Sequence, residues 1–218
     1  MTPLRRALAF LAAASLSMGA PGARSAQAPD PAEIPWRPLA EALASKGAIE
    51  AKFTERRFFS FRREPTVLTG VIRVSADRGL SLQYTAPEAS EVIVDAAGLV
   101  IRDARGRERE LPASSRDGGA IAALLPIMRF DIAALIPRFE MRATLEGSGW
   151  KIDFTPRDPE AARSLGLISI EGSMADVTHI SIRKSASQRI EIDVGETRSG
   201  VTFTPDELAR HFRRTGKR

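Results

Sequence analysis

Cysteine is absent from this chain of 218 residues, which also has only two histidines and one tyrosine. Without cysteine the chain has no disulfide, no thiol nucleophile and no cysteine to carry a lipid anchor. It also lacks a Gly-x-Ser-x-Gly elbow, Ser-x-x-Lys, His-Glu-x-x-His, a glycine-rich phosphate loop and an acidic calcium loop. We therefore expect no enzyme activity, no cofactor and no metal site.

A hydrolase is the alternative that these absences leave open, since carboxylates alone can perform glycosidic chemistry. Its activity would depend on a single carboxylate or on His179. That histidine lies among the strand residues Val177, Ile180 and Ile182, where a structural role is the usual one.

The apolar run at residues 7–18 is too short to cross a membrane, which takes about 20 residues. It follows Arg5 and Arg6, and Ala26-Gln27-Ala28 precedes Pro29. A basic start, a short apolar segment and an A-x-A site are typical of a secretory signal peptide. The sequence predicts that residues 1–28 are cleaved near Ala28, that the protein is exported to the periplasm, and that residues 29–218 form a single domain.

A strong excess of charge of one sign is also lacking. Without the three arginines of residues 1–28, 29 of the 32 basic residues remain against 27 acidic ones, a net charge of +2. We therefore expect no nucleic-acid partner. Hydrophobic residues make up 43% of the chain, enough for one substantial core.

Alternation of apolar and polar residues is what the chain has in abundance. It runs through residues 68–103, where Ile72 and Val74 alternate with Arg73 and Ser75, and turn formers separate the segments. Further alternating segments are predicted at 49–61, 139–145, 150–154, 167–171, 177–183, 189–194 and 201–203. We predict a mainly β (α+β) fold: an incomplete antiparallel barrel of about eleven strands.

Three local features qualify this pattern. Phe58, Phe59 and Phe61 break the alternation, which predicts a bulge or a strand end covered on both sides. The charged residues 102–110 are interpreted as a solvated hairpin tip, and residues 195–200 as a turn.

Helices are predicted at both ends and in the middle of the chain. Residues 36–45 form an amphipathic helix that Gly47 ends, and Thr204 caps a terminal helix to Phe212. Between the strands, residues 118–128 and 132–136 are helical with almost no polar face, and Asp131 is the N-cap of the second. Such apolar helices must lie on a hydrophobic surface, which identifies them as a cover for the sheet.

The order of these elements resembles the LolA-like periplasmic carriers of outer-membrane lipoproteins and their LolB-like receptor relatives. The resemblance covers residues 35–212 and is carried by four segments: Ile49-Glu-Ala-Lys-Phe-Thr-Glu55, Leu68-Thr-Gly-Val-Ile72, Gly79-Leu-Ser-Leu-Gln-Tyr-Thr-Ala-Pro87 and Val92-Ile-Val-Asp95. It implies that acyl chains lie between the concave side of the barrel and a lid of short helices. Ala96 stands where the family has glycine in Asp-Gly. Ala76 stands where the family has an arginine that fastens the lid, and Arg78 could replace it only through a rearranged turn.

Strand parity and helical spacing together give the candidate lipid-binding residues. The floor comprises Ile49, Ala51, Phe53, Ile72, Val74, Leu80, Leu82 and Tyr84. The lid comprises Leu124, Leu125, Met128, Ile132, Leu135 and Ile136. The alternative for each of these side chains is that it simply packs in an ordinary core.

The predicted function is a periplasmic carrier that shields the acyl chains of a lipoprotein or other lipidated cargo during transfer to the outer membrane. Its partners would be that cargo, an inner-membrane donor complex and an outer-membrane acceptor, with transient contact to a membrane surface, and the carrier itself would be a monomer. The alternative is a non-carrier adaptor that docks to an envelope lipid- or glycolipid-export machine through Arg56, Arg57, Arg62 and Arg63.

Overall fold

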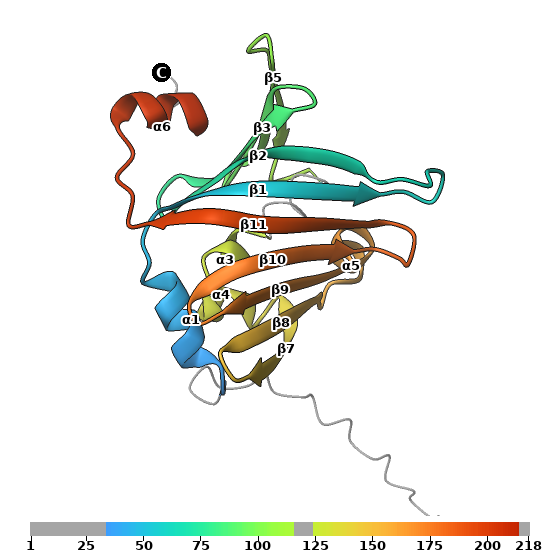
Figure 1. Ribbon diagram of the computed structural model, residues 1–218, viewed down its shortest axis with the longest axis vertical. Helices are drawn as coiled ribbons and strands as arrows, with labels where there is room; N and C mark the ends of the chain where they lie inside the picture. The colour runs from blue at the N-terminus through green and yellow to red at the C-terminus, as the bar shows by residue number, and fades with distance from the viewer. Residues whose placement is uncertain (1–33, 116–123, 214–218) are drawn as a thin grey trace, which may run out of the picture.

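Figure 1 shows the computed structural model, which describes residues 34–115 and 124–213. The predicted signal peptide, residues 1–28, lies outside the described residues, as does the first part of the apolar segment 118–128.

A single antiparallel sheet of eleven strands forms the body of the described chain (Figure 1). The strands are β1 (Ile49–Phe58), β2 (Thr66–Ser75), β3 (Gly79–Ala86), β4 (Ser90–Asp95), β5 (Gly98–Asp103), β6 (Glu108–Pro112), β7 (Phe139–Glu146), β8 (Gly149–Pro156), β9 (Leu167–Ser173), β10 (Asp176–Arg183) and β11 (Arg189–Ser199). Their order is β6-β5-β4-β3-β2-β1-β11-β10-β9-β8-β7, so β6 and β7 are edge strands and the sheet is not closed. The predicted fold class is confirmed.

The pairing of β1 with β11 joins the two halves of the sheet. Within each half, strands that follow one another in the chain pair with each other, whereas this pair brings Ile49 opposite Ser199 and Phe58 opposite Arg189. The first strand of the chain is therefore central, and one face of each half contributes to the concave side.

The described residues also form five short helices: α1 (Arg37–Ala44), α3 (Leu125–Met128), α4 (Ile132–Leu135), α5 (Pro159–Leu165) and α6 (Pro205–His211). Helices α3 and α4 lie on the concave side (Figure 1), whereas α6 contacts β4 and β5 through His211–Glu91 and through Arg102, which donates to Arg210 O. The predicted N-caps are present, because Asp131 accepts a hydrogen bond from Ala134 N and Thr204 forms a capping box with Glu207. None of the helices in these two described ranges is both long and apolar enough to span a bilayer.

Gly70 of β2 lies in a crowded position between β1 and β3. It pairs with Phe53 on one side and Tyr84 on the other, and these two rings meet edge to face at 5.4 Å above it. A Cβ at this position would stand 2.0 Å from the carbonyl oxygen of Gln83 and 2.9 Å from the Phe53 ring. The ring contact therefore requires glycine in β2.

The end of the sheet near Ser199 differs from the sequence prediction. Strand β11 continues to Ser199 through the predicted turn at 195–200, and residues 201–203 are not a strand. A register shift between Ala51 and Phe53 lets β11 continue past Gly195, because the irregularity lies within the pair and does not end it.

Two predictions about polar and aromatic residues are wrong in part. Residues 104–110 are exposed in the β5–β6 hairpin, as predicted, but Arg102 is buried, since its guanidinium forms ion pairs with Glu91 and Glu108 under α6. Strand β1 does end at Phe58, but Phe61 is 80% exposed, so this strand end is not covered on both sides, and the register shift opposite Ala51–Phe53 places the extra residue in β11.

Candidate functional site

The concave face of the sheet gathers the side chains that alternation assigned to one side. Ile49 pairs with Val74, and Ala51 pairs with Ile72. Across the next pair of strands, Ile72 meets Leu82 and Val74 meets Leu80. These six side chains form a continuous apolar floor over β1, β2 and β3 because paired residues point to the same face.

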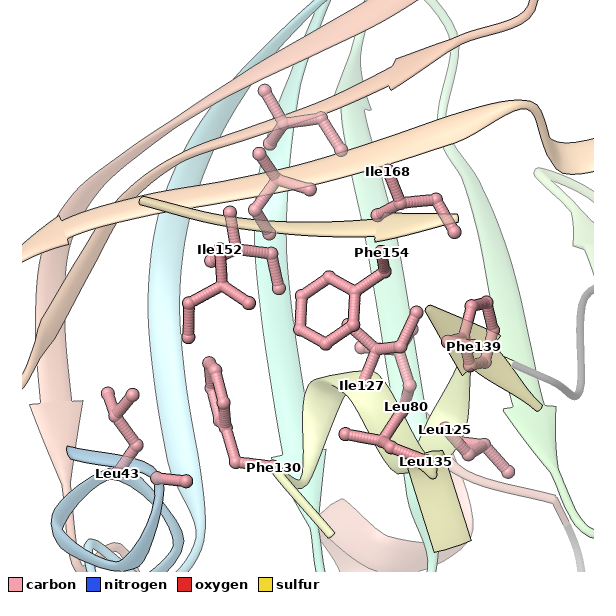
Figure 2. Close-up of a cluster of buried hydrophobic side chains, with 14 of the residues drawn as sticks. Leu43, Leu80, Leu125, Ile127, Phe130, Leu135, Phe139, Ile152, Phe154 and Ile168 are labelled. Carbon is pink, nitrogen blue, oxygen red and sulfur yellow. The ribbon is translucent and has the colours of Figure 1, made fainter. Parts of the chain in front are cut away.

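The α3–α4 segment covers this floor as a lid. Ile127 and Leu135 are fully buried, and the predicted lid residues Leu125, Ile132 and Ile136 are at most 9% exposed. Figure 2 shows side chains from the lid and from the strands converging in one cluster. The lid is thus packed on the floor as part of the core.

Phe130 joins the two lid helices and carries a positive φ of 51°, which a non-glycine residue rarely adopts. This turn directs its ring toward the sheet, where it contacts Trp150 of β8 edge to face at 6.2 Å. Phe130 therefore ties the lid to the half of the sheet that follows it in the chain.

A cavity of about 80 Å³ remains between the floor, the lid and α1. Its lining is mainly apolar and includes residues from both halves of the sheet: Leu43, Lys46, Ile49, Ala51, Ile72, Val74, Met128, Phe130, Ile170, Ala175, Asp176, Val177, Ile180, Val194 and Thr197. An apolar cavity of about 150 Å³ accepts one benzene ring. The cavity is therefore too small for an acyl chain while the lid is seated.

Five of the fourteen predicted site residues line the cavity: Ile49, Ala51, Ile72, Val74 and Met128. The others lie in the core around it. Phe53, Leu80, Tyr84, Leu125, Ile132, Leu135 and Ile136 are buried, and Leu82 and Leu124 are partly buried against the cluster. For these nine side chains, ordinary core packing describes their position with the lid closed.

Several lining residues were missed in the sequence. Ile170, Ile180 and Val194 alternate within strands that the sequence did predict, so the same parity argument could have found them once β11 was paired with β1. Phe130 gave no such signal, because its place depends on the positive φ of one turn.

A single ion pair stands at the edge of the cavity. Lys46, in the turn after α1, forms a salt bridge with Asp176 at the start of β10, and both side chains line the cavity. This pair joins the α1–β1 turn to the β9–β10 turn, next to the apolar lining.

The β2–β3 turn has Ala76 where the resemblance implies a lid-fastening arginine, and an arginine from another element contacts this turn. Arg78 pairs with its neighbour Asp77 at 3.6 Å, and Ala76 offers no polar side chain. Instead Arg129, on the lid, donates from Nη2 to the backbone oxygen of Ser75 at 3.5 Å. A hydrogen bond from Ser75 Oγ lowers the pKa of Asp77, and the charges of Arg78 and Arg129 act in the same direction. The arginine that contacts this turn comes from the lid.

A buried polar group interrupts the concave face beyond Phe53. The Tyr84 hydroxyl donates to Glu55 at 2.7 Å, and Arg57 pairs with Glu55 and donates to the Tyr84 oxygen at 3.1 Å. Burial, together with the charge of Glu55, raises the pKa of the Tyr84 phenol. Because Tyr84, Glu55 and Arg57 supply hydrogen-bond partners to one another, their polar groups can be buried beside the apolar floor.

The two histidines lie away from the cavity. His179 lies 2.9 Å from Asp193, which also pairs with Arg56, and the hydrogen bond with His179 lowers the pKa of Asp193. His211 of α6 contacts the buried Glu91 at 2.9 Å. Within residues 34–115 and 124–213 no group of three or more His, Cys, Asp or Glu side chains is placed to hold a metal ion.

Comparison with known proteins finds similarity in fold only. No family model and no curated protein sequence matches the chain. Among solved structures, a LolA superfamily protein from Nitrosomonas europaea is similar over 79% of this chain and 96% of its own, with 10% identity and a TM-score of 0.42.

Two further structures are similar over nearly the same share of this chain. A structure of the MucA/MucB complex of Pseudomonas aeruginosa contains a chain that shares 17% identity with this one, with a TM-score of 0.44. The match covers 78% of this chain and 57% of that chain. A putative outer membrane lipoprotein-sorting protein domain from Vibrio parahaemolyticus shares 8% identity over 79% of this chain and 95% of its own, with a TM-score of 0.42. Two of these three structures are described as a LolA superfamily protein and a lipoprotein-sorting protein domain. All three TM-scores lie below 0.5, so these likenesses do not say what this chain binds.

Proposed function

We propose that this protein is a periplasmic carrier that holds the acyl chains of a lipoprotein or other lipidated cargo between the concave sheet and the α3–α4 lid, on the way to the outer membrane. The observation that carries the proposal is an apolar lid packed over an apolar floor, with a residual cavity between them. The proposal assigns no chemical reaction to the chain. Cargo enters when the lid moves off the floor and leaves when the lid returns.

The size of the cavity supports a lid that exchanges with its cargo. Pockets for ligands of ordinary size measure about 300–1,000 Å³, whereas this cavity measures about 80 Å³. Displacing Met128, Leu135 and their neighbours would open the floor along β1, β2 and β3. The lid side chains therefore occupy the place that the proposal gives to the acyl chains.

The energies of lid and cargo are of similar size. Each buried CH₂ contributes about 0.8 kcal/mol, so a 16-carbon chain contributes on the order of 10 kcal/mol before entropy losses. Burial of an aliphatic side chain contributes roughly 1.5–3 kcal/mol, and Leu125, Ile127 and Leu135 of the lid are all buried. Because the lid competes with cargo for one surface, net affinity is low enough for release.

Native mass spectrometry of the protein isolated from its own periplasm tests the proposal directly. We expect a fraction of the molecules to carry the added mass of an acylated ligand. The test variant is Val177→Phe, which places a larger side chain at the edge of the cavity. The control variant is Val71→Phe, because Val71 precedes Ile72 in β2 and therefore faces the convex side of the sheet. Val177→Phe should lose the ligand and Val71→Phe should retain it.

Two results would contradict the carrier. One is a protein that is isolated without ligand and also binds no apolar fluorescent probe. The other is equal ligand loss in both variants while circular dichroism shows both to be folded.

A further inference from the structure

The turns β1–β2 and β10–β11 lie together at one end of the sheet (Figure 1). The register explains this, because Arg57 pairs with Ile190 and Phe58 with Arg189, which places the last residues of β1 beside the first of β11. We call residues 57–65 and 183–190 the basic tip. Since the cavity is lined by the opposite end of β1, from Ile49 to Ala51, the basic tip is a separate surface.

The basic tip is strongly cationic. Its two segments contain six basic side chains, Arg57, Arg62, Arg63, Arg183, Lys184 and Arg189, against one carboxylate, Glu64. Arg57 and Arg189 also pair with Glu55 and Glu191. The positive excess therefore comes from the exposed side chains of the two turns.

A depression of about 240 Å³ lies between the two turns. Its lining consists of three cations, one amide and four apolar side chains, with no carboxylate: Arg57, Phe58, Phe59, Ile182, Lys184, Gln188, Arg189 and Ile190. The Arg189 guanidinium lies over the Phe58 ring at 3.7 Å from its centre. Such a lining offers charge and hydrogen bonds to an anionic group that has apolar matter beside it.

The most exposed large apolar side chain of the described residues stands next to this depression. Phe61 is 80% exposed and stacks on Phe59 at 5.3 Å, and Val67 at the start of β2 is 50% exposed. Aromatic side chains beside basic ones are typical of surfaces that enter the headgroup region of a bilayer. A bilayer also accepts a protruding ring without a preformed pocket, whereas a protein partner would have to supply one.

We propose that the basic tip docks onto a membrane surface that carries anionic phospholipid headgroups. Lys184 and the arginines of the two turns contact the phosphates, and Phe61 inserts among the headgroups. This docking does not depend on the carrier proposal, because it uses no residue that lines the cavity. Of the adaptor patch inferred from the sequence, Arg57, Arg62 and Arg63 belong to the basic tip, whereas Arg56 lies outside it and pairs with Asp193.

Vesicle flotation with the mature full-length chain tests this docking. We expect binding to vesicles of phosphatidylcholine with phosphatidylglycerol and none to phosphatidylcholine alone. Binding should weaken strongly at about 1 M salt, where the Debye length is near 3 Å. Removing one surface cation costs roughly fivefold in affinity, so Arg63→Gln/Lys184→Gln should bind about 25-fold more weakly.

The control variants remove two positive charges, or one exposed apolar side chain, from surfaces outside the basic tip. Arg105→Gln/Arg109→Gln lowers the net charge equally at the β5–β6 hairpin, and Leu145→Ser matches Phe61→Ser at a side chain that is 53% exposed on β7. Both controls should float like the unchanged protein, whereas Phe61→Ser should float less.

Three results would overturn the proposal. They are equal losses in the control and tip variants, equal binding to neutral vesicles, and saturable binding of inorganic phosphate without any vesicle binding. The last result would mean that the depression recognises a free anion and no bilayer. A protein that floats but carries no acyl ligand would sustain the docking and remove only the carrier function.

Discussion

The lid residue Arg129 donates a hydrogen bond to the backbone oxygen of Ser75, where β2 ends. At 3.5 Å this contact is at the long limit for a hydrogen bond, and Nε of the same guanidinium is buried without a partner. The lid is therefore held to the β2–β3 turn by a weak polar contact, and mainly by the packing of its apolar side chains. The cost of moving this lid is therefore mainly the burial lost by its apolar side chains.

Arg129→Met should loosen the lid, because it removes the hydrogen bond and the attraction to Asp77 while keeping the bulk of the side chain. A net hydrogen bond contributes about 0.5–1.5 kcal/mol, so the affinity for an apolar fluorescent probe should rise roughly two- to tenfold. Arg138→Met, at an exposed arginine just beyond the lid, is the control and should leave the affinity unchanged. Unchanged or weaker binding in Arg129→Met would mean that packing alone holds the lid.

Leu135→Ala should destabilise the protein as a core substitution does, because this lid side chain is fully buried. The expected loss in the free energy of unfolding is about 2–5 kcal/mol, measured by urea denaturation. Leu145→Ala, on the exposed side of β7, should change it by no more than about 0.5 kcal/mol. A small loss at Leu135 would show that the lid spends much of its time away from the floor.

Gly70→Ala should disturb the Phe53–Tyr84 contact, because the new methyl group would meet the Gln83 carbonyl oxygen. Forced overpacking costs about 1–3 kcal/mol, to be read from thermal or urea unfolding. Gly195→Ala is the matched control, since its Cβ would stand 3.6 Å from the nearest atom, Lys52 O. Equal stability of the two variants would contradict the close approach of β2 and β3.

Tyr84→Phe gives a pH-dependent test of the buried polar group. The Tyr84 pKa is raised above its ordinary 10.0, so the folded state favours the protonated phenol. Its contribution to stability is complete below pH 10.0 and is lost as the pH rises further, because the unfolded chain ionises first.

Tyr84→Phe should therefore be less stable than the unchanged protein at neutral pH, by about 1–3 kcal/mol, because Glu55 loses its buried donor. The difference should shrink above pH 10.0, as followed by urea denaturation at several pH values. A difference that stays constant across that range would show that the Tyr84 hydroxyl does not titrate as its surroundings require.

Much of the fold could be predicted from short segments of the sequence. The alternation at Ile72 and Val74, the hairpin from Phe139 to Pro156, and the caps Asp131 and Thr204 each depend on neighbours a few residues away. Their side chains decide between strand, turn and helix locally, so the predictions held. The prediction of a strand at residues 201–203 was wrong, because a short alternating segment does not indicate whether a neighbouring strand is available to pair with it.

The sequence by itself determined that one face of each strand is apolar and that the segment ending at Ile136 must cover such a face. Only the tertiary structure decided which faces meet. The pairing of β1 with β11 brings Ile180 and Val194 to the same cavity as Ala51. The ion pairs of Arg102 remove its charge from solvent. The positive φ of Phe130 directs its ring from the lid toward Trp150. These contacts join residues far apart in the chain, and their energies depend on burial and packing that no local pattern encodes. The small volume of the cavity is likewise a property of the packed molecule.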